Sequence, residues 1–139
     1  MDKNTREKIL GSAQAFKMTS ERDMELLSQN NHGTLQIPPV VCMAFSIELF
    51  LKFLLKSTAY GHNLLNLFNE LDESTKSDIV EATPLTRPLF EFHLITHSEI
   101  FEDWRHLLHG EDLIKRVNHD FMKNFLQSLS HIATHHYIA

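Results

Sequence analysis

The stretch that decides the fold is AFSIELFLKFLLKSTAYGHNLLNLF, residues 44–68. Its first half is almost entirely apolar, which indicates a helix buried on most of its circumference at the centre of a bundle. Glu48 and Lys52 interrupt this half four residues apart, a spacing that places both side chains on one helical face. An exposed pair of this kind contributes only roughly a few tenths of a kcal/mol. Because apolar neighbours leave little room for a wet strip, we expect the pair to face the interior or line a cleft, where each charge needs a partner.

The rest of the chain shows the same helical rhythm. Apolar residues recur at helical spacings over residues 5–28, 38–58, 89–108 and 112–135, and two short amphipathic segments cover residues 64–71 and 72–82. Four glycines and four prolines provide few tight turns, and no alternating strand pattern occurs. The sequence therefore predicts an all-α fold with one domain over residues 1–139. We expect an antiparallel four-helix-core bundle with one or two additional short helices.

Local signals set the expected ends of the middle helices. Gly61 ends the long apolar helix, and either His62 or Asn63 opens the short helix that follows. Either Asp72 or Ser74 caps the next short helix, because a side-chain oxygen at that position accepts from a free backbone N–H.

The composition limits the classes of partner. The formal net charge is −5, whereas a domain that mainly holds a nucleic-acid backbone is normally basic. We expect no DNA binding, although RNA stays among the candidate partners. Six aromatic residues of the second half follow a core spacing with few basic residues between them, so we interpret them as core and not as a stacking platform: Phe90, Phe92, Phe101, Trp104, Phe121 and Phe125.

The compartment follows from the cysteine count and the first residues. Cys42 is the one cysteine and lies in an apolar run, which indicates a buried thiol in a reducing compartment. The first ten residues are polar and lack the apolar core of a signal peptide. The apolar run over residues 40–55 is interrupted by two charges, and its length suggests that it is too short to span a bilayer. We expect a cytoplasmic protein that uses no membrane.

Two later residues are candidate partners for Glu48. His62 follows the end of the long apolar helix, and Arg105 lies beside the single tryptophan in FEDWRHLLHGED, residues 101–112. A carboxylate shared between an arginine and a histidine is a satisfied network. We therefore predict a polar cluster of Glu48, Lys52, His62 and Arg105.

The pattern A-x-x-x-E-L-x-L-K-x-L-L over residues 44–55, then G-H-N-L at 61–64 and F-E-D-W-R at 101–105, resembles HEPN-superfamily proteins. The similarity covers residues 37–125. It implies an antiparallel four-helix core and a homodimer. Many members are metal-independent ribonucleases of toxin–antitoxin or defence systems, and others are non-catalytic binding modules, including partners of minimal nucleotidyltransferases. The first interpretation is a non-catalytic or divergent member that acts through such a partner in RNA- or nucleotide-linked stress or defence, without a cofactor.

The second interpretation is an active ribonuclease, and the resemblance implies an arginine followed after four to six residues by a histidine. Arg87 and His93 fit this count, but Pro88 follows the arginine where the family has a polar residue. Arg105 and His109 match the sequence context better and share a helical face, although three residues separate them. The histidine would move a proton at the ribose and the arginine would stabilise charge on the phosphate.

The third interpretation is a metal-binding bundle. Histidine pairs with a spacing of four residues are a known way to place two ligands on one helix face. This chain has ten histidines, so such pairs also arise by chance, and no HExxH motif accompanies them. The candidate ligands are His93, His97, His131 and His135.

Overall fold

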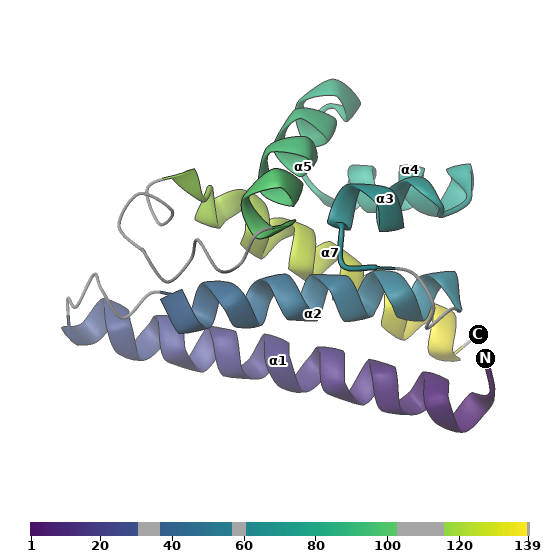
Figure 1. Cartoon of the computed structure of the whole chain (residues 1–139), viewed down its shortest axis with the longest axis horizontal. Coiled ribbons are helices and arrows are strands. Elements are labelled where there is room, and N and C mark those ends of the chain that lie inside the picture. The colour runs from purple at the N-terminus through teal and green to yellow at the C-terminus, as the bar shows by residue number, and fades with distance from the viewer. Residues whose placement is uncertain (31–36, 57–60, 103–115, 139) are drawn as a thin grey trace.

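The computed structural model describes residues 1–30, 37–56, 61–102 and 116–138, and every regular element in these ranges is a helix. The fold is all-α, as the sequence predicts, and no strand occurs in the described ranges. The helices are α1 (Lys3–Asn30), α2 (Ile37–Leu55), α3 (Leu64–Asn69), α4 (Glu73–Ala82), α5 (Arg87–Glu102) and α7 (His119–Ile138) (Figure 1).

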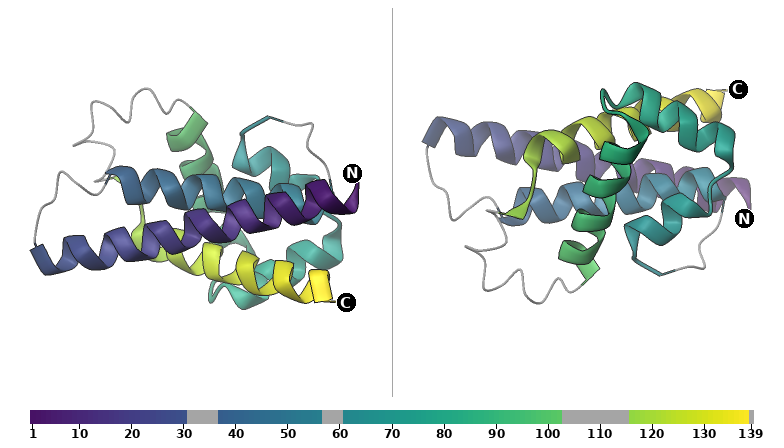
Figure 2. Two further views of the ribbon diagram at one scale, coloured as in Figure 1. Left: turned by 90° about the horizontal axis from the view of Figure 1, so that it is seen from below. Right: turned by 90° about the horizontal axis from the view of Figure 1, so that it is seen from above.

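Three long helices, α1, α2 and α7, extend along the long axis of the molecule (Figure 1). The helix α1 runs in the direction opposite to α2 and α7, and α5 crosses the other face of α2 at a steep angle (Figure 2). The short helices α3 and α4 cover the same side as α5, toward the end of the molecule where both termini lie (Figure 1). The helix α2 contacts α1, α3 and α7, which makes it the central element.

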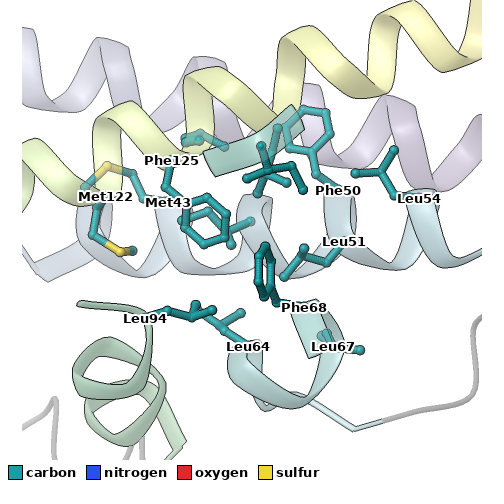
Figure 3. Close-up of a cluster of buried hydrophobic side chains, with 14 of the residues drawn as sticks. Met43, Phe50, Leu51, Leu54, Leu64, Leu67, Phe68, Leu94, Met122 and Phe125 are labelled. Atoms are coloured by element: carbon teal, nitrogen blue, oxygen red, sulfur yellow. The ribbon is translucent and has the colours of Figure 1, made fainter. Parts of the chain in front are cut away.

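The core is built around α2 because this helix is apolar on nearly all sides. Ile47, Phe50, Leu51 and Phe53 have no exposed surface, although they point to different sides of the helix. Leucines of α3 and α5 and residues of α7 pack against them (Figure 3). This packing confirms the prediction of a central buried helix.

A second cluster of the core is aromatic and joins α3, α5 and α7. Phe90 has no exposed surface, and its ring centroid lies 5.1 Å from that of Phe68, 5.7 Å from Phe121 and 5.2 Å from Phe125. The two rings of α7 meet that of Phe90 edge to face, a favourable arrangement of aromatic quadrupoles. The expectation that all six aromatics are core was wrong for Phe92, whose exposed fraction is 62%, and Trp104 lies outside the described residues. The position of Phe92 on the outer side of α5 is the reason for its exposure.

The helices α1 and α2 approach each other closely where their residues are small. Ala13 and Ser46 are both fully buried, and the Ser46 hydroxyl donates to the Ala13 carbonyl at 2.6 Å. The backbone of α1 can approach α2 because neither side chain is large, and the hydrogen bond satisfies the one buried hydroxyl at this contact.

Caps explain where the helices begin and end. The side chains of Asn63, Asp72 and Asn118 accept the backbone N–H groups of Asn66, Thr75 and Phe121 at 3.0, 2.7 and 3.0 Å. Of the sequence alternatives, Asn63 and Asp72 are the caps of α3 and α4. The prediction of one continuous helix from Asp112 to His135 was wrong, because Val117 and Asn118 are not helical and α7 begins at His119, capped by Asn118. Asp112 itself lies outside the described residues.

The end of α2 also differs from the prediction. The apolar pattern suggested a helix to Thr58, but α2 ends at Leu55 because Lys56 adopts a left-handed backbone with φ of 57°. Its N–H donates to the Phe53 carbonyl at 3.2 Å, as in a common helix C-cap.

The window Pro38–Leu55 is 18 residues long and apolar enough to cross a membrane by length and composition. The expectation that this segment is too short was therefore wrong. More than half of the window, 56%, is buried inside the protein, and a buried core helix passes the same test.

Candidate functional site

The charged pair of α2 forms an ion pair at the edge of the core. The Lys52 ammonium lies 3.2 Å from Glu48 Oε2, and the two side chains are only 13% and 11% exposed. Burial of a lone carboxylate costs several kcal/mol, so this partner is what allows Glu48 to lie among apolar residues. Glu48 and Lys52 therefore do not form an exposed surface pair; they are largely buried, as the sequence analysis expects.

His62, which precedes α3, lies against Glu48 in the middle of α2. Gly61 has φ of +58°, a conformation that disfavours side chains, and it directs the next residue back toward the middle of α2. There His62 Nδ1 lies 3.0 Å from each carboxylate oxygen of Glu48. Asn63 then caps α3, so each residue of the Gly-His-Asn run has its own role.

Polar contacts with α5 hold the start of α3. The Ser98 hydroxyl donates to the Asn63 side-chain oxygen at 2.8 Å and accepts from the Leu65 N–H at 3.0 Å. Ser98 is 3% exposed, so the contact is shielded from water. The start of α3, and with it the position of His62, is therefore tied to α5 as well as to α2.

In the part of the chain that the structure describes, His62 has one engaged nitrogen and one without a partner. A carboxylate only accepts hydrogen bonds, so Nδ1 carries the proton and donates to Glu48. In the neutral ring Nε2 is then an acceptor. The His62 side chain is 81% exposed, which leaves Nε2 accessible to a ligand. A carboxylate that fixes the tautomer of an exposed histidine is an arrangement suited to binding a donor or moving a proton.

A cavity of about 230 Å³ opens beside this cluster. Its wall contains two carboxylates and one imidazole, and the rest of the lining is apolar. The lining residues are Val41, Ala44, Phe45, Glu48, His62, Leu64, Phe101 and Glu102. Lys52 contacts Glu48 but does not line the cavity. The polar side chains that face it are therefore hydrogen-bond acceptors when His62 is neutral.

The structure brings together three of the four residues of the predicted polar cluster, Glu48, Lys52 and His62. Arg105 and the candidate catalytic His109 lie outside the described residues, so their contacts with the cluster stay predictions.

The other arginine–histidine pair has separate contacts. Arg87 Nη1 lies 2.9 Å from Glu73, and its Nε lies 2.9 Å from Glu91. These carboxylates raise the pKa of the Arg87 guanidinium, the bond to Glu91 having the larger effect. His93 stacks on Phe121 with the ring centroids 5.1 Å apart. No contact between Arg87 and His93 occurs among the described interactions.

The candidate metal ligands fall into two regions. His97 uses both nitrogens, since Nδ1 donates to the His93 carbonyl at 2.7 Å and Nε2 accepts from the Asn118 N–H at 2.9 Å. His131 and His135 line a groove of about 430 Å³ between α4 and α7. Within the described ranges, no group of three or more histidine, cysteine, aspartate or glutamate residues has the geometry of a metal site.

Cys42 is partly buried in α2. Burial raises the pKa of its thiol, with a smaller effect from Asp23, so the reactive thiolate is disfavoured at neutral pH.

Sequence spacing alone did not identify three wall residues of the cavity: Phe45, Phe101 and Glu102. Phe45 lies three residues before Glu48 on α2, a helical neighbour that the spacing could have identified. The other two come from the end of α5, and only the fold places them beside α2.

No protein-family model, curated protein or solved structure matches this chain.

Proposed function

We propose that this chain is a HEPN-like helical-bundle protein that binds a protein partner through the cavity beside Glu48, in an RNA- or nucleotide-linked stress or defence pathway. The observation that supports binding is the lining of this cavity. An exposed histidine is oriented by a buried ion pair, and aromatic side chains lie next to it. The antiparallel four-helix core, the homodimer and the cytoplasmic location are part of the same proposal.

Affinity isolation from the native host tests partner binding. The wild-type chain is compared with Phe45→Ala, which alters the cavity wall, and with Phe92→Ala, which removes an exposed ring of α5 outside the cavity. We expect one stoichiometric partner with wild type and Phe92→Ala, and its loss with Phe45→Ala. Recovery of the chain alone, or equal recovery of the partner with both variants, would contradict the proposal.

The ribonuclease is the alternative function. The oriented His62 supports it, since a histidine with a fixed tautomer and a free nitrogen is suited to proton transfer. The separate contacts of Arg87 and His93 favour the other pair, Arg105 and His109. Mixed RNA is incubated with wild type and with Arg105→Ala/His109→Ala in EDTA. Equal cleavage by both proteins, or none by either, removes that pair.

The metal-binding bundle stays the third alternative, with His131 and His135 as the remaining pair. Elemental analysis of untagged protein tests it. Less than about a tenth of an equivalent of zinc, nickel or iron would reject a resident metal.

A further inference from the structure

We propose that the cavity beside Glu48 binds an arginine side chain of the partner polypeptide. This inference rests on the proposed function, because it names the chemistry that the partner would bring to the same cavity. Three properties of the cavity favour an arginine: its hydrogen-bonding groups, its charge and its size.

The hydrogen-bonding groups of the wall favour a ligand that only donates. Glu48 Oε1 has acceptor capacity left beyond its bond to His62. Nε2 of neutral His62 is a second acceptor and the Glu102 carboxylate is a third. A guanidinium has five N–H donors and no acceptor, so it complements such a wall, whereas a nucleobase also brings acceptors that would find no donor there.

The charge of the wall matches one guanidinium. Lys52 balances the charge of Glu48. Among the described residues, no hydrogen bond or ion pair engages the Glu102 carboxylate, so the wall keeps about one negative charge. The chain as a whole carries −5, which disfavours the phosphates of a nucleotide and favours a cationic segment.

The size and the aromatic residues favour arginine over lysine. At about 230 Å³ the cavity is smaller than the roughly 300–1,000 Å³ typical of drug-sized ligands, so it suits a single side chain. Phe45 and Phe101 supply flat apolar surface in the wall. A planar, weakly hydrated guanidinium stacks on such rings and reaches several acceptors in its plane, but an ammonium is compact and strongly hydrated.

The residues flanking this arginine have an apolar surface to contact. The ring centroids of Phe16 and Phe45 lie 5.7 Å apart, and these side chains are 36% and 45% exposed. Phe16 belongs to α1, and Phe45 lines the cavity, so the two rings form one apolar surface from α1 to the mouth of the cavity. We therefore infer that the partner segment has an apolar residue close to the arginine.

Peptide binding to the purified full chain tests the inference. The probes are capped peptides with a central arginine, lysine or citrulline between leucines. Citrulline keeps the planar shape without the charge. Binding is followed by NMR chemical shifts, and we expect the arginine peptide to bind about tenfold more tightly than citrulline and several-fold more tightly than lysine. Equal binding of arginine and citrulline, or no binding of any peptide, would overturn the proposal.

Matched variants locate the binding. Glu102→Gln should weaken the arginine peptide about tenfold, whereas Glu99→Gln, which removes an exposed charge of α5 outside the cavity, should leave it unchanged. Phe45→Ala should weaken it several-fold and Phe92→Ala should not. Circular dichroism confirms that each variant is folded. Equal affinities for Glu102→Gln and Glu99→Gln would refute the site.

Three further outcomes would also refute the inference. One is binding of GMP or of short RNA at the cavity in place of the peptide. The second is peptide binding that appears only after Arg105→Ala, because the chain's own arginine would then be the competing ligand. The third is loss of a host partner with Phe45→Ala, together with equal binding of arginine and citrulline peptides. This third result would leave the proposed function intact and remove only the arginine.

Discussion

His97 is expected to make the stability of the protein depend on pH, because its neutral form joins two helices. The side chain is 1% exposed. Nδ1 lies 2.7 Å from the His93 carbonyl and Nε2 lies 2.9 Å from the Asn118 N–H, at the cap of α7. A backbone N–H can only donate, so Nε2 must be unprotonated. A proton there would break the bond and place two donors against each other.

The sign and magnitude follow from the pKa. Burial lowers the pKa of His97 below its ordinary value of 6.5, and the side chains of His93 and His119 lower it further against the opposing backbone bond to His93. Below about pH 6.5 the unfolded chain takes up a proton that the folded chain binds less readily. The free energy of unfolding therefore falls as pH drops from this value toward the folded pKa. The slope from this group is at most about 1.4 kcal/mol per pH unit.

Urea unfolding of wild type, His97→Gln and His131→Gln between about pH 8 and pH 5.5 measures this contribution. Glutamine does not titrate. At the upper pH His97→Gln should be less stable than wild type by about 1–3 kcal/mol, for the lost bond and the imperfect fit. The difference in free energy of unfolding between wild type and His97→Gln should decrease by about 1 kcal/mol or more at the lower pH. His131 is exposed on α7 and serves as the control. A constant difference for His97→Gln, or the same decrease for His131→Gln, would refute this reasoning.

The remaining predictions concern stability, measured by urea unfolding at neutral pH. Lys56→Gly should raise the free energy of unfolding by about 0.5–1 kcal/mol, because it relieves a left-handed backbone. Gly61→Ala should lower it by about 1 kcal/mol for the opposite reason, and a change of the opposite sign in either variant would contradict the prediction for that variant. Phe90→Ala should cost about 3–5 kcal/mol and Phe92→Ala less than about 0.5 kcal/mol, since one ring is buried and the other exposed. Equal losses of free energy of unfolding in the two variants would contradict the burial of Phe90 and the exposure of Phe92 on α5. Ser46→Ala should cost about 1 kcal/mol for its bond to α1, and an unchanged stability would show that this bond contributes nothing net.

The sequence predicted the parts of the fold that depend on local spacing. The separation of Glu48 from Lys52 placed both on one face, and their apolar neighbours pointed that face inward. The caps Asn63 and Asp72 were among the predicted alternatives because a side-chain oxygen before an amphipathic segment has a direct physical role.

Other features could not be predicted from spacing. A lysine rarely adopts the left-handed conformation, so no signal identified Lys56 as the end of α2. The helical rhythm that begins near Asp112 obscured the start of α7, which a capping side chain determines at Asn118. The cavity depends on where α5 crosses α2, a tertiary fact that brings Glu102 near His62.

The two partners of Glu48 differ in what they contribute, and this difference supports a binding role for the cluster. Lys52 is nearly as buried as Glu48 and comes from the same helix. It therefore balances the charge of the carboxylate independently of the residues that follow α2. His62 is mostly exposed, and the carboxylate would remain paired without it. A fold that needed only to bury the charge of Glu48 would have no use for a left-handed glycine that returns an exposed imidazole to it. Among the described contacts, this arrangement leaves one nitrogen of His62 accessible beside the cavity, which supports the binding that we propose.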